Sequence, residues 1–132
     1  MGSYLEMYKK VPKTLTRKMQ PGGTKDFGFC KITMVHAEHP STCDGIYRAP
    51  ITGGLGVGYV ITIPCHDVRI YHAGDTNLFS DMKLIGELYK PDYAMLPVGD
   101  VLGMDPREAA YAVKHFLKNV KTVIPMHFDT LP

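Results

Sequence analysis

Three side chains of the kinds that bind metal ions each follow a run of apolar residues: His39, Asp75 and His127. Asp75 comes directly after Gly74, a residue type that lets the backbone turn sharply and approach a ligand closely. Neutral imidazole and carboxylate are suitable ligands for Zn²⁺, Fe and Mn²⁺. Because open α/β sheets place their sites at the carboxyl ends of the strands, we expect these three residues to converge there as metal ligands.

The remaining histidines are weaker candidates. His36 lies three residues before His39, and side chains an odd number of positions apart on a strand point to opposite faces. At most one of the two is therefore expected to be a ligand, and His36 is in phase with the apolar residues that should pack. His66 lies in a turn and His115 on a helix, so we expect both to be exposed or packed rather than metal-bound.

Two nearby features have structural interpretations. Thr76 follows Asp75, and we expect its hydroxyl to orient the Asp75 carboxylate by a hydrogen bond. The glycine-rich run 53–58 looks like a phosphate-binding loop, but such a loop follows a strand and opens a helix. These glycines instead precede a strand-like run, and no Gly-Lys-Ser/Thr follows. The run is therefore interpreted as a flexible turn.

The elements of the first half follow from periodicity. Apolar spacing predicts a short helix over 5–11, and the glycines and prolines of 19–28 predict turns. Alternation with period two predicts a strand over 31–37. Two β-branched runs, Val57–Ile63 and Val68–His72, are separated by four residues and predict a hairpin.

The second half alternates helices with strands. A helix is predicted over 80–89, and Pro91 ends it. Asp105 begins a second helix as an N-cap, with a proline next and an acid at the third position. Short apolar runs predict a strand over 93–97 and a last, buried strand over 122–127. The expected buried side of the first helix is Met82, Ile85, Leu88 and Tyr89. The whole indicates a mixed α/β sheet.

Composition limits the class of protein. The chain has 132 residues, 45% of them hydrophobic, which is enough for one domain with a core. The net charge of +2 gives no general attraction to nucleic acid, although seven basic residues within 1–31 form either a solvated surface or an anion-binding arm. No apolar run is long enough to span a membrane. Three cysteines without a C-x-x-C pair indicate free thiols and a cytoplasmic protein.

Several segments resemble the metallo-β-lactamase superfamily, in particular its small metal-dependent hydrolases akin to ascorbate-6-phosphate lactonase. The most specific segment is Tyr-His-Ala-Gly-Asp-Thr-Asn-Leu-Phe-Ser-Asp-Met over 71–82. The other matching segments are 22–28, 37–41, 91–97, 104–106 and 124–132. The resemblance therefore covers most of the chain from about residue 22 onward.

The resemblance implies a two-metal hydrolase that acts on a small-molecule lactone, ester or phosphoester. His39 looks like a ligand of the first metal, Asp75 like the catalytic carboxylate that bridges both ions, and His127 like a ligand of the second. Metal-bound hydroxide would attack the substrate, and the metals would stabilise the charge that develops. Zinc is the expected ion, with manganese or iron as alternatives.

One departure from the family pattern is large. The family's earlier His-x-His-x-Asp-His motif is absent from this sequence. The resemblance therefore implies that residues 1–132 are a partial domain, the C-terminal half of an αββα sandwich, with a mixed sheet and helices on one face. Such a half would leave an apolar sheet face to cover. We expect a homo-oligomer or a complementary N-terminal half to cover it, using residues such as Ile32, Met34, Val60, Ile70 and Tyr71.

Two other functions stay open from the sequence. The chain could be a non-catalytic half-fold that binds a partner through its exposed sheet. It could also be an iron oxygenase whose single ion is held by two histidines and one carboxylate. Helices between the strands make the oxygenase the less favoured of the two, because such sites usually lie on a barrel of strands.

Overall fold

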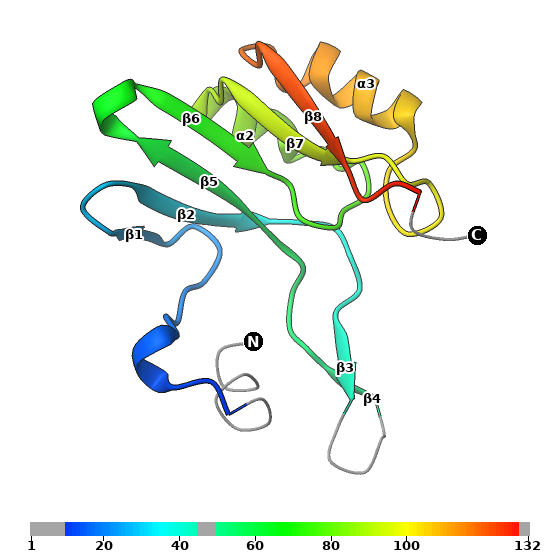
Figure 1. Ribbon diagram of the computed structural model, residues 1–132. Coiled ribbons are helices and arrows are strands. Elements are labelled where there is room, and N and C mark those ends of the chain that lie inside the picture. The colour runs from blue at the N-terminus through cyan, green and yellow to red at the C-terminus, as the bar shows by residue number, and fades with distance from the viewer. Residues whose placement is uncertain (1–9, 45–49, 130–132) are drawn as a thin grey trace.

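A six-stranded mixed sheet forms the body of the protein (Figure 1). The computed structural model describes residues 10–44 and 50–129. The order across the sheet is β1-β2-β5-β6-β7-β8, in which β1, β2, β5 and β6 pair antiparallel and β6, β7 and β8 pair parallel. The strands are β1 (Thr24–Asp26), β2 (Lys31–His36), β5 (Val57–Ile63), β6 (Val68–His72), β7 (Tyr93–Pro97) and β8 (Thr122–Met126).

The two α-helices within residues 10–44 and 50–129 pack on the same face of this sheet. The helix α2 (Met82–Tyr89) connects β6 to β7, and α3 (Pro106–His115) connects β7 to β8. Parallel neighbouring strands need such crossover connections, because a tight turn reverses the chain and makes the next strand antiparallel. Figure 1 looks onto the face without helices, with β3 (Thr42–Asp44) and β4 (Pro50–Thr52) forming a separate hairpin that projects from one end. The described part of the chain also contains two 3₁₀ turns, η1 (Lys13–Leu15) and η2 (Pro64–His66). The predicted α/β class with helices on one face is confirmed.

Local sequence signals account for several of these elements. The Asp105 side chain accepts a hydrogen bond from the Glu108 amide, and the Glu108 carboxylate accepts one from the Asp105 amide, which confirms the capping box of α3. The alternating strand and the hairpin are also confirmed, as β2 and as β5 with β6. The turn segment 19–28 contains the short strand β1, and the predicted helix over 5–11 lies mostly outside the described residues.

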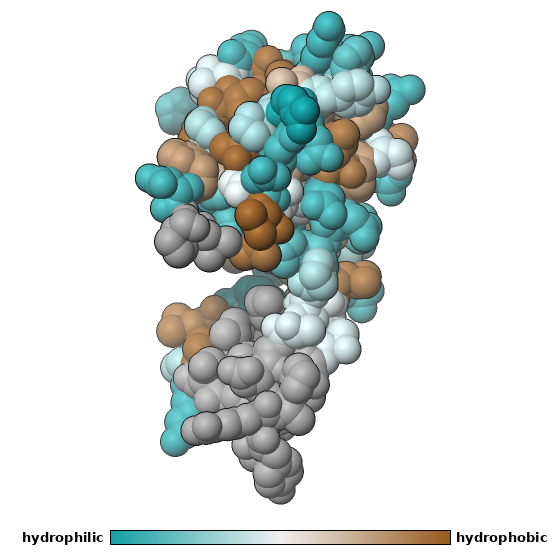
Figure 2. Space-filling model, turned by 90° about the vertical axis from the view of Figure 1, so that its right-hand side faces the viewer, coloured by the Kyte–Doolittle hydropathy of each residue, from teal (hydrophilic) through white to brown (hydrophobic). Residues whose placement is uncertain are grey.

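Two expectations about burial are wrong. Leu88 of α2 is 72% exposed, because Met82 and Ile85 carry the packing and the helix ends one residue after Leu88, at Tyr89. The strand β8 is not buried, since four of its five residues are exposed. It lies at the edge of the sheet beyond β7, so only one neighbour and α3 shield it. Seen from the side of β8 and α3, apolar side chains lie among polar ones at the surface (Figure 2).

The core lies between the sheet and the helices. Paired positions on neighbouring strands share a face, and the register aligns Thr33 with Val60, Val60 with Tyr71, and Tyr71 with Ala94. Val60, Tyr71 and Ala94 belong to one buried cluster with residues of α2 and α3, and the largest members of this cluster are Tyr71, Met82, Leu96, Met104 and Leu117. Val60 and Tyr71 therefore belong to the covered face, which corrects their expected place on the uncovered one.

The alternate positions of the same strands point to the other side. Met34, Tyr59, His72, Met95 and Ile124 follow one another across the sheet in register. The parallel row one step away contains Ile32, Ile61, Ile70 and Tyr93. Each of these residues is half-buried or exposed. We call this surface the open face, and Ile32, Met34 and Ile70 lie on it as the sequence predicts.

Candidate metal centre

Asp75 and His127 meet at the carboxyl end of the parallel strands. The Nε2 atom of His127 lies 3.7 Å from the Oδ2 atom of Asp75. Asp75 follows β6 and His127 follows β8, and β7 lies between these two strands. Both side chains are accessible, with 50% of the Asp75 side chain and 31% of the His127 side chain exposed. Two donor atoms at this separation can both reach one ion, because zinc bonds to nitrogen and oxygen are about 2.0–2.2 Å long.

A sharp turn at Gly74 places Asp75. Gly74 has φ of +71°, and a Cβ atom there would lie 2.5 Å from the Val57 carbonyl oxygen. No residue with a side chain fits this position without a shift of the backbone. The Gly74 amide donates a hydrogen bond to Nδ1 of His72, at 3.1 Å. The turn is therefore held by the last residue of the strand that precedes it.

Thr76 fixes the next part of the loop, although not in the way the sequence predicts. Its hydroxyl, which is fully buried, accepts a hydrogen bond from the Glu38 amide and donates one to the Asn77 carbonyl. The Asn77 amide in turn donates to the Glu38 carbonyl. A hydroxyl has one proton, so Thr76 cannot also donate to the Asp75 carboxylate. It positions Asp75 through the backbone, by attaching the loop to the chain that follows β2.

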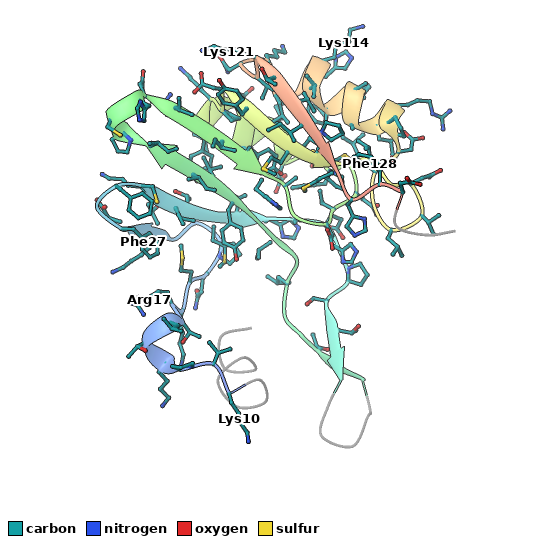
Figure 3. The ribbon with its side chains drawn as sticks, viewed as in Figure 1. Lys10, Arg17, Phe27, Lys114, Lys121 and Phe128 are labelled. Carbon is teal, nitrogen blue, oxygen red and sulfur yellow. The ribbon has the colours of Figure 1, made fainter. Side chains whose placement is uncertain are left out.

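His127 lies where the backbone turns at the end of β8. Its φ of 55° is in the left-handed region, which a residue with a side chain adopts only where surrounding contacts hold it. The Val98 amide donates to the Met126 carbonyl, and a side chain at Gly99 would collide with the His127 carbonyl. Figure 3 shows Phe128 at this end of β8 and Lys121 at the other. Gly99 has no local signal in the sequence, because the residue it accommodates is 28 positions away.

His39 reaches the same region through its backbone. It follows Glu38, whose amide and carbonyl are bonded to Thr76 and Asn77 on either side of the Asp75 loop. Its Nδ1 atom lies 2.6 Å from the carbonyl oxygen of Pro40. Among the described residues, no group of three or more His, Cys, Asp or Glu side chains is placed to hold a metal. The role of His39 as a ligand stays a prediction, and the three-ligand iron site gains no support.

The three histidines that the sequence marks as weaker candidates make other contacts. His36 is half-buried, contacts the Glu38 carboxylate at 3.3 Å, and packs edge-on against Phe79. His66 is exposed in η2, and His115 is exposed on α3, where its ring lies against Tyr111.

Strong charge interactions lie away from this centre. Lys121 donates a hydrogen bond to Asp92 at 2.8 Å, at the opposite end of the sheet from His127 (Figure 3). This bond, together with one from the Arg69 amide, holds the pKa of Asp92 below its ordinary value. These residues join the amino ends of β6, β7 and β8, which stabilises the strand order that brings Asp75 and His127 together.

Comparisons with known proteins define the class of fold. A family model described as a beta-lactamase superfamily domain matches residues 2–128. A metallo hydrolase from Ignicoccus hospitalis superposes with a TM-score of 0.74 at 30% identity, covering 99% of this chain and 52% of that one. A metallo-beta-lactamase fold protein from Bacillus subtilis, 17% identical with a TM-score of 0.64, is similar in fold over 97% of this chain and 50% of its own.

The sheet, the helices on its one face and the comparisons together define a metallo-beta-lactamase type of fold. The chain belongs to the beta-lactamase superfamily. A protein of Koribacter versatilis named a metal-dependent hydrolase is 48% identical over 133 aligned residues, which cover 100% of this chain and 54% of that protein. The chain spans about half the length of the curated relatives it matches. The resemblance noted in the sequence is confirmed for the superfamily, and the narrower likeness to ascorbate-6-phosphate lactonase stays a prediction.

Proposed function

We propose that the chain is the metal-binding part of a metal-dependent hydrolase that acts on a small-molecule lactone, ester or phosphoester. The proposal depends on one observation, the approach of Asp75 Oδ2 and His127 Nε2 to 3.7 Å at an accessible edge of the sheet. The names of the relatives support it, since they include metal-dependent hydrolases and a metallo hydrolase. Imidazole and carboxylate also form the donor set that zinc prefers, with manganese or iron as alternatives.

In this proposal His39, from the chain that follows β2, would hold one ion, His127 would hold a second, and Asp75 would be a ligand of both. A bound divalent ion would supply a Lewis acid that lowers the pKa of water and stabilises developing negative charge. The chain's own contribution is to fix the ligands. Gly74 turns Asp75 towards the edge, Thr76 anchors its loop, and the segment that follows β7 supports the backbone of His127.

The two-metal site that the resemblance implies needs more ligands than His39, Asp75 and His127 can supply, since each zinc ion takes three or four protein ligands. We therefore propose that residues 1–132 are a partial domain, and that further ligands come from a second copy or from a complementary N-terminal half. The isolated chain should then be a poor catalyst.

Among the described residues, no helix is long and apolar enough to cross a membrane. A cytoplasmic location, inferred from the cysteines, belongs to the proposal; Cys30 and Cys65 are free thiols.

Calorimetric titration with Zn²⁺ and Mn²⁺ tests the proposal. We expect Asp75→Asn and His127→Ala each to weaken metal binding at least about 10-fold, as the loss of a ligand should. His115→Ala is the matched control, because His115 is exposed on α3 and lies outside the centre. Equal metal affinity in all three variants would refute the assignment. Rapid metal-dependent hydrolysis by the isolated chain, abolished by Asp75→Ala, would refute the claim that further ligands are needed.

A further inference from the structure

The loop between β7 and α3 lies beside the proposed metal centre. We call residues 98–104 the β7–α3 loop, which Figure 1 shows in yellow next to the end of β8, in red. At the start of this loop, the Val98 amide donates a hydrogen bond to the Met126 carbonyl, at 3.0 Å. Met126 immediately precedes His127, so this end of the loop is attached one residue away from a proposed ligand.

The other end of the loop is attached beside the second proposed ligand. The Met104 amide donates a hydrogen bond to the Thr76 carbonyl, at 3.2 Å, and the Met104 side chain is fully buried. Thr76 immediately follows Asp75. A Cβ atom at Gly103 would lie 3.3 Å from the same Thr76 carbonyl oxygen, so the two segments pack closely. The β7–α3 loop therefore joins the segment of Asp75 to the segment of His127.

Hydrogen bonds within the loop fix its shape. The Gly103 amide donates to the Asp100 carbonyl, and the Asp100 amide donates to the Met104 carbonyl, each at 3.2 Å. Asp100 has φ of 67°, a left-handed conformation that aspartate adopts more readily than most residues. Segments with internal hydrogen bonds and a buried anchor are among the less mobile parts of a protein. The loop thus has the properties of a spacer of fixed length.

Such a spacer matters because the two ligands do not follow neighbouring strands. Asp75 follows β6 and His127 follows β8, with β7 between them. Neighbouring strands lie about 4.8 Å apart, so the backbones of β6 and β8 are separated by about 10 Å. The two side chains nevertheless approach to 3.7 Å, which requires them to lean towards each other across the end of β7. The backbone that leaves β7 must therefore leave room for both.

Gly99 provides this room. A Cβ atom at Gly99 would collide with the His127 carbonyl and would lie 3.5 Å from the Cα atom of Phe128. Gly99 does not have a positive φ, so the position requires the absence of a side chain and not an unusual backbone conformation. A larger residue here would push the turn of His127 away from the loop, while the other end of the loop stays attached to Thr76.

We propose that the β7–α3 loop is a spacer that sets the separation between Asp75 and His127, and that Gly99 is a positioning residue of the metal centre. The proposal rests on the proposed function, since it takes these two side chains to be metal ligands. Every contact that carries it lies between described residues, so it does not depend on what covers the open face.

Calorimetric titration of Gly99→Ala with Zn²⁺ tests the proposal. We expect zinc affinity to fall about 10- to 100-fold, the range typical of losing a group that orients a metal ligand. Gly86→Ala is the matched control, because Gly86 also lacks a positive φ and its Cβ atom would also collide with a backbone carbonyl, that of Phe116. Phe116 lies at the end of α3 away from the loop. The control should lose stability but keep the zinc affinity of the unmodified chain.

Amide hydrogen exchange without metal tests the link between the two segments separately. In Gly99→Ala the Met104 amide, at the far end of the loop, should exchange faster relative to the Ala109 amide of α3 in the same molecule. Gly86→Ala should not change this ratio. Circular dichroism establishes that each variant is folded. If Gly99→Ala does not fold, Gly103→Ala replaces it, because its Cβ atom displaces the Thr76 carbonyl by only a few tenths of an ångström.

The outcomes separate this proposal from the proposed function. Weaker zinc binding and faster Met104 exchange in the loop variant, but not in Gly86→Ala, support the spacer. Unchanged zinc affinity in a folded loop variant overturns it, as does an equal loss of affinity in Gly86→Ala. If the unmodified chain does not bind zinc, the proposed function fails, and the exchange ratio alone then decides whether the loop links the two segments.

Discussion

Substitution of Thr76 by valine tests how the loop that carries Asp75 is held. Valine has nearly the shape of threonine, so Thr76→Val removes the hydroxyl with little change in packing. The Glu38 amide then loses its acceptor and the Asn77 carbonyl loses its donor. Valine has no polar side-chain atom, so it offers neither group a replacement partner. Thr76 is also fully buried, so water does not take the place of its hydroxyl.

The size of the expected loss of stability depends on the surroundings of the Glu38 amide and the Asn77 carbonyl. An orphaned buried polar group costs about 1–3 kcal/mol. Glu38 and Asn77 are themselves exposed residues, so water can reach part of their backbone and lower the cost. We therefore expect a total loss of about 1–3 kcal/mol in the free energy of unfolding. Metal affinity should fall too, because the Asp75 loop is no longer attached to the segment that follows β2.

Urea unfolding followed by circular dichroism measures the first effect and metal titration the second. Protein concentration must be matched between variants, because association alters apparent stability. Thr76→Ser is the control, since it keeps the hydroxyl and loses one methyl group, at a cost of about 1 kcal/mol and with little change in metal affinity. If Thr76→Val matches the unmodified chain in both measurements, the hydroxyl does not hold the loop and the argument is wrong.

Two further predictions concern the fold. The Tyr71 hydroxyl is fully buried, has no hydrogen-bond partner among the described residues, and has a pKa raised by burial. Tyr71→Phe should therefore raise the free energy of unfolding by about 1 kcal/mol in urea, and a clear loss would mean that the hydroxyl has a partner such as a bound water. Because the pKa of Asp92 lies below its ordinary 3.8, its contribution to stability is present above that pH and lost as the pH falls further through the folded pKa. Below about pH 4, the urea midpoint should fall less steeply with decreasing pH in Asp92→Asn than in the unmodified chain. Identical pH profiles of the two proteins would contradict this.

The sequence determines the elements whose signals are local. The Asp105 capping box involves residues three positions apart, so α3 could be predicted from its own segment. Alternation within Lys31–His36 and the two runs joined by 64–67 predict β2 and the β5–β6 hairpin for the same reason. The turn at Gly74 that presents Asp75 is also a local feature, and the sequence identified it.

Burial and the pairing of site residues depend on the tertiary structure. The sequence could not tell that Thr122–Met126 is exposed, because an edge strand and a central strand have the same apolar run. It could not tell which alternate row of the sheet faces the helices, so Val60 and Tyr71 were misplaced while Ile70 was not. Helix packing selects that row, and it involves residues far apart in the chain.

The short distance between Asp75 and His127 also depends on the tertiary structure. The two residues are 52 positions apart, and each follows its own strand. They meet because β6, β7 and β8 lie side by side and parallel, with both crossovers on one face and with Asp92 bonded to Lys121 and to the Arg69 amide at the opposite ends of the strands. The sequence therefore determined which side chains stand at strand ends, whereas strand order decided which of them meet. Strand order is set by the burial of one apolar face, which no single segment contains.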